Sequence, residues 1–211
     1  MGNDVKDDAL DALRRVLVRS HALGFLGPGD PMFHVEHALG FGDELEGATD
    51  VVDLGTGGGV PGLVLAAIDD RRYVLVDSMQ KRCTFLESAV DDLDLVERVQ
   101  VVCGRAEDVG REERFRGAAD AVVSRSFGKP AVAAECAAPL LRPGGRLVVS
   151  EPPESERSDL RWDSTGLARV GQVDAGLRHH RGSSYRVLVQ EAACPDEFPR
   201  RAGVPAKRPL F

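Results

Sequence analysis

A glycine-rich stretch at residues 51–62 carries the residue spacing with the most chemical content in this chain. It reads Val-Val-Asp-Leu-Gly-Thr-Gly-Gly-Gly-Val-Pro-Gly, so that an apolar run ends on Asp53 and Pro61 and Gly62 open an apolar, helix-like segment. This order predicts a strand, a tight turn and a helix. Glycines let the backbone adopt positive φ and approach a ligand closely. A helix N-terminus next to the turn attracts a polar or anionic group.

Two cofactors use such a turn. The dinucleotide pattern G-x-G-x-x-G is met by Gly57, Gly59 and Gly62, but it starts two residues beyond Gly55. The pattern acid-x-G-x-G-x-G, typical of S-adenosylmethionine (SAM) methyltransferases, begins at Asp53. A carboxylate there suits a cationic sulfonium and would repel a pyrophosphate, so SAM is favoured over NAD; a turn without ligand is the remaining alternative. Our candidates for the methionine end of the cofactor are Asp53, Gly55, Thr56, Gly57, Gly59 and Pro61.

Acidic and basic residues follow the next apolar runs. Asp77, with Ser78 after it, closes the second run and can accept both hydroxyls of a ribose. SAM and NAD sites share this feature, and a helix cap is the structural alternative for Asp77. Residues Arg105, Ala106 and Glu107 follow the third run, where methyltransferases hold adenine; an acid favoured by the helix dipole is the alternative for Glu107.

Arg125 ends the fourth apolar run, between Ser124 and Ser126. An arginine at this edge can orient an acceptor base or a phosphate. We therefore treat it as the candidate catalytic residue and as a cofactor contact. The alternative is a salt bridge to a neighbouring acid.

Strand and helix patterns alternate along the middle of the chain. Strands are predicted at 51–54, 73–77, 99–102, 119–123 and 146–149, and helices at 5–23, 31–45, 62–68, 81–93 and 130–141. This alternation indicates an α/β fold with a doubly wound parallel sheet, whose ligands bind beyond the carboxyl ends of the strands. Two further strands, 167–177 and 184–192, should form a C-terminal antiparallel pair, after a polar loop at 151–164 with one helix from Ser155. We expect a single domain over 1–211, with a helical extension (1–47), a Rossmann-like core (48–197) and a basic tail (198–211).

Charge and cysteine content limit the function classes. The net charge of −7 at pH 7 argues against a broadly cationic surface, and the basic block is the tail, with Arg200, Arg201, Lys207, Arg208 and no acid. These four residues are our candidates for contacts to RNA phosphates, and neutralisation of acids on their own domain is the alternative.

The four cysteines lie far apart, so we expect no metal site, no disulfide frame and a reduced cytoplasmic setting. No apolar run is long enough to suggest a membrane span, and His34 and His37 favour a structural or substrate-facing role over a metal pair.

Five stretches together carry a resemblance to one family. These are 52–62, the V-D-S-M-Q-K-R-C-T-F-L run at 76–86, 105–107, 124–125 and the F-P-R-R-A-G-V-P-A-K-R-P-L tail at 198–210. They resemble the bacterial RsmG (GidB) family of small-subunit ribosomal RNA guanine-N7 methyltransferases, and the tail is the most diagnostic part. The resemblance implies a class I methyltransferase fold, SAM as cofactor, and transfer of its methyl group to a guanine N7 of 16S ribosomal RNA, as free RNA or in the 30S subunit, by a cytoplasmic monomer.

The resemblance also implies roles for the candidate residues. Asp53 and the glycine turn would hold the methionine end, Asp77 the ribose, and Ala106 with Glu107 the adenine, while Arg125 would orient the acceptor. Guanine N7 has a free lone pair and no proton, so alignment suffices and no general base is needed. Glu151 stands where the family usually carries a basic residue. That difference leaves open a related methyltransferase with another RNA or a small-molecule acceptor; a non-catalytic SAM- or NAD-binding module is the other alternative.

Overall fold

A seven-stranded sheet forms the centre of the molecule in a computed structural model that describes residues 2–156 and 161–211. The strands lie in the order β3-β2-β1-β4-β5-β7-β6. Their bounds are Asp50–Leu54 (β1), Arg72–Asp77 (β2), Val99–Cys103 (β3), Ala119–Ser124 (β4), Leu141–Glu151 (β5), Gln172–His180 (β6) and Ser183–Gln190 (β7). β1 to β5 are parallel, whereas β7 runs antiparallel to both β5 and β6. The predicted fold class, with its C-terminal antiparallel pair, is therefore confirmed.

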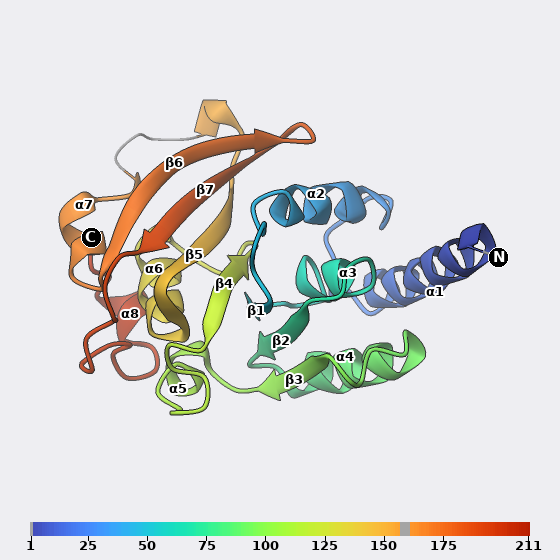
Figure 1. Cartoon of the computed structure of the whole chain (residues 1–211), viewed down its shortest axis with the longest axis horizontal. Helices are drawn as coiled ribbons and strands as arrows, with labels where there is room; N and C mark the ends of the chain where they lie inside the picture. The colour runs from blue at the N-terminus through green and yellow to red at the C-terminus, as the bar shows by residue number, and fades with distance from the viewer. Residues whose placement is uncertain (1, 157–160) are drawn as a thin grey trace.

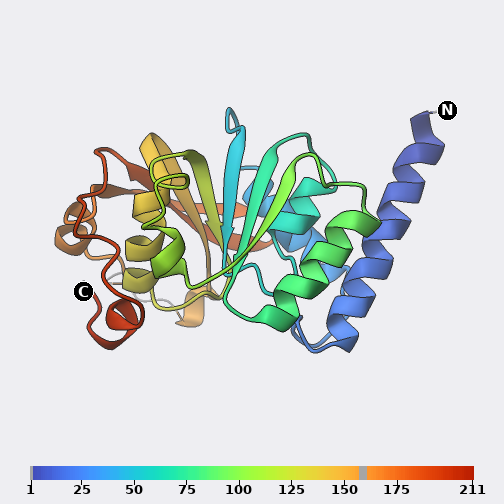
Figure 2. The same ribbon diagram turned by 90° about the horizontal axis from the view of Figure 1, so that it is seen from below.

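Helices cover both faces of this sheet (Figures 1 and 2). One face carries α3 (Gly62–Ala66) and α4 (Gln80–Asp92), with the N-terminal helices α1 (Gly2–Ala22) and α2 (Phe33–Gly42) beyond and beside them. The other face carries α5 (Ala106–Val109), α6 (Pro130–Ala137), α7 (Ser164–Ala168) and α8 (Val204–Lys207). Each face has its own buried apolar cluster, and the strands contribute alternate side chains to the two clusters, as the period of two requires.

The N-terminal extension is tied to the glycine turn. Ser20 on α1 donates a hydrogen bond from its hydroxyl to the carbonyl oxygen of Gly58 over 3.0 Å. Arg19 pairs with Asp92 on α4 at 2.8 Å and lies over the Phe85 ring. The extension therefore supports the turn from outside the sheet, which a sequence pattern alone does not indicate.

The prediction of a strand beginning at Leu167 is wrong. Asp163 accepts a hydrogen bond from the backbone N–H of Gly166 over 2.7 Å and caps the short helix α7, so the strand begins only at Gln172. β5 in turn begins at Leu141, ahead of the predicted 146, because Leu141 already pairs with Ala119 before an irregularity in the register. Of the helix predicted from Ser155, a single 3-10 turn is seen at Glu154–Glu156, and 157–160 lie outside the described residues.

Candidate cofactor and acceptor site

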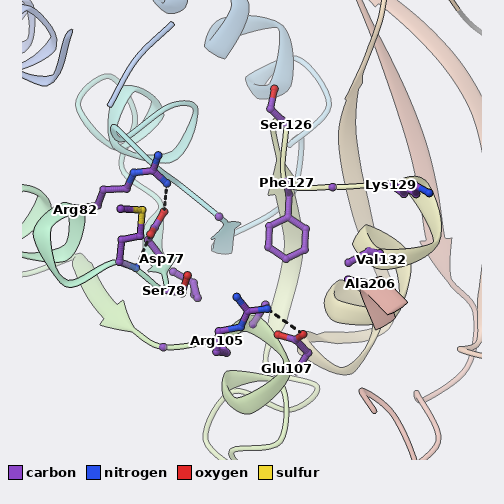
Figure 3. Close-up of a pocket in the computed structure, with 16 residues that line it drawn as sticks. Asp77, Ser78, Arg82, Arg105, Glu107, Ser126, Phe127, Lys129, Val132 and Ala206 are labelled. Carbon is purple, nitrogen blue, oxygen red and sulfur yellow. Dashed lines mark hydrogen bonds and ion pairs between the residues drawn. The ribbon is translucent and has the colours of Figure 1, made fainter. Parts of the chain in front are cut away.

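Two adjoining cavities open at the carboxyl edge of the parallel strands, where ligands bind in such sheets. The first has a volume of about 410 Å³ and the second about 570 Å³. They share the wall formed by Ser126, Phe127 and Gly128, directly after β4. Figure 3 shows the first cavity, whose other lining residues include Gly55, Asp77, Ser78, Arg82, Arg105, Ala106, Glu107, Lys129 and Ala206.

The glycine turn takes its shape from its glycines. Gly55 and Gly57 have φ of +76° and +58°, in the left-handed region that side chains disfavour. A Cβ on Gly55 would also lie 2.5 Å from the Phe127 ring, which points into the first cavity in Figure 3. The backbone N–H groups of Gly55 and Thr56 donate to the carbonyl of Val76 at 2.9 and 3.0 Å, so the turn is held at the end of β2.

Asp53 lies beneath this turn, outside the cavity wall. Its side chain is fully buried, and one carboxylate oxygen accepts the N–H of Gly62 at 2.7 Å. The other oxygen has no hydrogen-bond partner within the described part of the chain. Burial raises the pKa of Asp53 to about 7, against the opposing effects of the hydrogen bond from Gly62 and the charge of Arg125. Asp53 thus lies outside the cavity lining and supports the turn through Gly62, so that its direct contact with the cofactor stays a prediction. Thr56, Gly57, Gly59 and Pro61 also lie outside the lining of the cavity.

Asp77 both lines the first cavity and closes the turn. Its Oδ1 accepts the N–H of Met79 at 2.8 Å, and its Oδ2 accepts the N–H of Gly57 at 3.0 Å. Arg82 lies 3.4 Å from Oδ2 and turns toward it across the cavity wall (Figure 3). Asp77 thus lines the cavity and also holds the backbone that leads into α4, while its contact with a ribose stays a prediction.

Glu107 joins the wall of the cavity to the C-terminal segment. Its side chain is 3% exposed, and Oε1 accepts the N–H of Gly203 at 2.8 Å and lies 3.4 Å from Arg105. Burial alone would raise the pKa of Glu107, but these donors outweigh burial and the pKa is lowered. Glu107 is consequently ionised, and its charge ties together the entrance to α5 and the segment that ends in α8.

Arg125 lies in the wall of the second cavity. Its Nη2 lies 2.9 Å from Nδ1 of His34, and no carboxylate within the described ranges lies within 4.0 Å of it. Burial lowers the pKa of Arg125, and the charge of Asp53 opposes that effect. His37 lies in the same wall, and burial with the nearby Arg125 charge lowers its pKa to about 4. The salt-bridge alternative for Arg125 is thus not realised within the described ranges. The guanidinium lies half-buried in the wall of the second cavity beside His37, and Arg161, which pairs with Glu151, lines the same cavity.

Comparison with known proteins identifies the family. A model of the GidB family, described as rRNA small subunit methyltransferase G, matches residues 33–159. The chain belongs to this family. It is 38% identical over 176 residues to ribosomal RNA small subunit methyltransferase G of Deinococcus deserti, covering 81% of this chain and 72% of that one. The protein of the same name from Symbiobacterium thermophilum is 35% identical over 216 residues, covering 95% and 87%.

Solved structures agree on the fold. The O-methyltransferase from Bacillus cereus in complex with SAH has a TM-score of 0.62 at 18% identity, covering 85% of this chain and 90% of that chain. TomG, an O-methyltransferase from Streptomyces achromogenes in complex with SAM, has a TM-score of 0.59 at 19% identity, covering 86% and 90%. The predicted GidB family, the class I methyltransferase fold and SAM as the cofactor of that class are thereby confirmed.

The departure of this GidB chain at Glu151 has a structural explanation. The Glu151 carboxylate is 1% exposed and accepts a hydrogen bond from the indole N–H of Trp162. Arg161 lies 3.4 Å and Arg186 4.0 Å from it. Two guanidinium groups therefore offset its charge, and it holds Trp162 in the wall of the second cavity without presenting a free anion there.

The basic tail of this GidB chain divides into one internal residue and three external ones. Arg200 binds the fully buried Glu135 of α6 through two side-chain hydrogen bonds of 2.8 and 2.5 Å, so the expectation that it contacts RNA is corrected. Arg201, Lys207 and Arg208 are exposed and keep their side chains available. The alternative of internal neutralisation is therefore realised by Arg200, and contact of the other three residues with RNA stays a prediction.

Several residues of the site were not among the predicted candidates. Phe127, Arg82, Lys129 and Ala206 line the first cavity, and Trp162 lines the second. Their sequence signals are weak, although Arg82 and Ala206 lie in the runs 76–86 and 198–210 that carry the family resemblance, and Phe127 follows Arg125 by two positions. Among the described residues, no group of three or more histidine, cysteine or acidic side chains is placed to hold a metal ion. The helices in the described ranges do not reach the length and apolarity that crossing a membrane requires.

Proposed function

We propose that this chain transfers the methyl group of SAM to N7 of a guanine in 16S ribosomal RNA. The observation that carries the proposal is the pair of adjoining cavities with a common wall at Ser126–Gly128. One cavity has the features of a nucleoside site, and the other holds a cation at the point where an acceptor would approach. Binding two reactants side by side in the correct orientation accelerates their reaction, because it removes the entropic cost of bringing them together.

The residues of the first cavity fit the cofactor. Its volume of about 410 Å³ is in the usual range for small-molecule sites. Asp77 would accept the ribose hydroxyls in place of Arg82, and Ala106 with Glu107 would contact the adenine. The unpartnered, buried oxygen of Asp53 beneath the turn favours a cation over a pyrophosphate. SAM supplies a methyl group on a cationic sulfur, and its loss to a nucleophile leaves a neutral thioether.

The second cavity would hold the acceptor base. Arg125 would donate a hydrogen bond to O6 of guanine or to a flanking phosphate, as arginine does in base recognition. It would thereby hold N7 in line with the methyl group. N7 carries no proton, so no side chain has to remove one. This agrees with the low pKa of His37, which keeps that imidazole neutral, and with the absence of an acid–base pair from the described lining of the cavity.

The exposed cations of the tail would contact RNA outside the cavity. Arg201, Lys207 and Arg208 lie on the outer surface of the segment that also lines the first cavity. Phosphate contacts supply affinity without sequence information, which suits a substrate as large as 16S RNA. A ribosomal substrate implies that the chain acts in the cytoplasm.

Labelled SAM can test the proposal with three acceptors: undermethylated 30S subunits, naked 16S RNA and a small-molecule extract. We expect label in RNA, with mass mapping of one guanine carrying the methyl group at N7. Arg125→Lys should retain part of the activity, because it keeps the charge and loses the planar fork. Label only in the small-molecule extract, or at another RNA atom, would contradict the proposal.

A further inference from the structure

The segment from Phe198 to Arg208 folds back onto the cofactor cavity. Ala206 on α8 lines the cavity, beside Val132 of α6 and close to Glu107 (Figure 3). The N–H of Gly203 donates to Glu107 over 2.8 Å. Gly203 has a φ of +79°, which lets the chain turn sharply into α8. One lining residue of the cavity therefore comes from a segment about 100 residues distant in sequence from Glu107.

One ion pair holds this segment in place. Glu135 is fully buried on the inner side of α6 and accepts the backbone N–H of Arg200 at 2.9 Å as well as its side chain. The same guanidinium donates to the carbonyl of Arg208 at 2.7 Å, across α8. Arg200 thus fixes both ends of the turn that presents Ala206. Burying a carboxylate without a cationic partner is strongly unfavourable. Undocking of the segment would leave Glu135 in that state, so the ion pair favours the docked position.

Arg201, the next residue along the chain, is exposed to solvent, whereas Arg200 is paired with the buried Glu135. In the described part of the chain no acid lies within 4.0 Å of Arg201. Two arginines of equal charge thus occupy an inner and an outer position on one segment. This contrast provides a matched control within the chain.

We propose that Arg200 is a positioning residue for cofactor binding, which acts by holding α8 in the place where its Ala206 lines the cofactor cavity. The proposal rests on the proposed function, since it assigns this cavity to SAM. It predicts that SAM affinity depends on Arg200 and that RNA affinity depends on Arg201. It also predicts that Glu107 needs the Gly203 N–H to stay aligned with the adenine.

Calorimetric titration with S-adenosylhomocysteine, together with steady-state kinetics on 30S subunits, tests the proposal. Arg200→Gln should weaken binding at least tenfold and raise KM for SAM, with KM for 30S subunits within about twofold. Arg200→Lys should recover part of the loss. Arg201→Gln should leave SAM binding unchanged and raise KM for 30S subunits. A merely structural role for Arg200 would change both KM values and kcat together.

A second variant keeps the proposal open to refutation if Arg200→Gln does not fold. Ala206 is exposed, so Ala206→Trp fills the cavity from the surface without disturbing the core. We expect an unchanged melting temperature and at least tenfold weaker binding of S-adenosylhomocysteine. Unchanged affinity in either folded variant, with an unmodified chain that binds SAM, overturns the role of Arg200 and leaves the proposed function intact. Failure of the unmodified chain to bind SAM overturns both.

Discussion

The Nη2 atom of Arg125 lies 2.9 Å from the Nδ1 atom of His34, across 91 positions of sequence. Arginine can only donate, so Nδ1 of His34 is the acceptor and its proton resides on Nε2. Burial, followed by the charge of Arg125, lowers the pKa of His34 and keeps the imidazole neutral. The N-terminal extension thereby supplies a residue that fixes the direction of the guanidinium in the second cavity.

His34→Phe should therefore impair acceptor use and spare the cofactor. Without its acceptor the guanidinium samples other directions, and we expect kcat/KM for 30S subunits to fall about tenfold, equivalent to about 1.4 kcal/mol. Affinity for SAM should stay unchanged in calorimetry. His34→Asn, whose side-chain oxygen can replace Nδ1 as acceptor, should recover most of the activity. Equal losses in both variants would contradict the hydrogen-bond role.

Cofactor affinity should depend on pH through Asp53. Its pKa of about 7 means that the carboxyl is charged above neutrality and uncharged below it. A cationic ligand is attracted only by the charged form, so SAM binding should weaken as the pH is lowered from 8 to 6. Titrations at several pH values measure this trend. Asp53→Asn should remove most of it, and a variant that keeps the full pH dependence would assign it to another group.

Asp77→Ala should weaken SAM binding at least about tenfold. A hydrogen bond to a charged group contributes about 1.5–3 kcal/mol, and the same carboxylate also holds the N–H groups of Gly57 and Met79. Calorimetry with SAM and with NAD separates the two cofactor classes. Asp77→Asn, which can still accept one of these bonds, should lose less. Tight binding of NAD without binding of SAM would be incompatible with our assignment of the cavity.

The exposed cations of the tail should govern the salt dependence of RNA binding. Replacing Arg201, Lys207 and Arg208 by glutamine should weaken RNA binding and flatten the log–log salt slope by up to about 2–3, since each phosphate contact contributes about 0.7–0.9. Filter binding over a range of salt concentrations measures the slope. SAM affinity should not change, because Arg200 is left in place. An unaltered slope in a folded variant would remove these three residues from the RNA surface.

Local sequence patterns were sufficient to predict the sheet and the edge at which the candidate residues converge. Asp77 ends β2 and the segment 105–107 follows β3, and strand ends in a parallel sheet meet at one edge. Their convergence on the first cavity could therefore be predicted. The strand expected at Leu167 was wrong because a capping contact from Asp163 outweighed an apolar pattern that suits helix and strand alike.

Long-range contacts explain what the sequence did not reveal. Arg200 and Arg201 are the same residue type, and only the burial of Glu135 on another element separates their roles. A signal did exist. Glu135 is the one acid in the apolar segment 130–141, and an acid buried in an apolar helix requires a basic partner. The contact of His34 with Arg125 had no comparable signal, since it depends on how the extension packs over the sheet edge.

The separation of inner and outer charges on the tail has a practical consequence for biochemistry on this chain. Dissolved ions screen exposed charges within about 8–10 Å at ordinary ionic strength, but they act weakly on a pair as enclosed as Arg200 and Glu135. Cofactor loading should therefore tolerate concentrated salt that strips away nucleic acid. A preparation saturated with SAM at high ionic strength and then diluted into RNA would start turnover from a single synchronised state, so that the methyl-transfer step could be timed apart from cofactor binding.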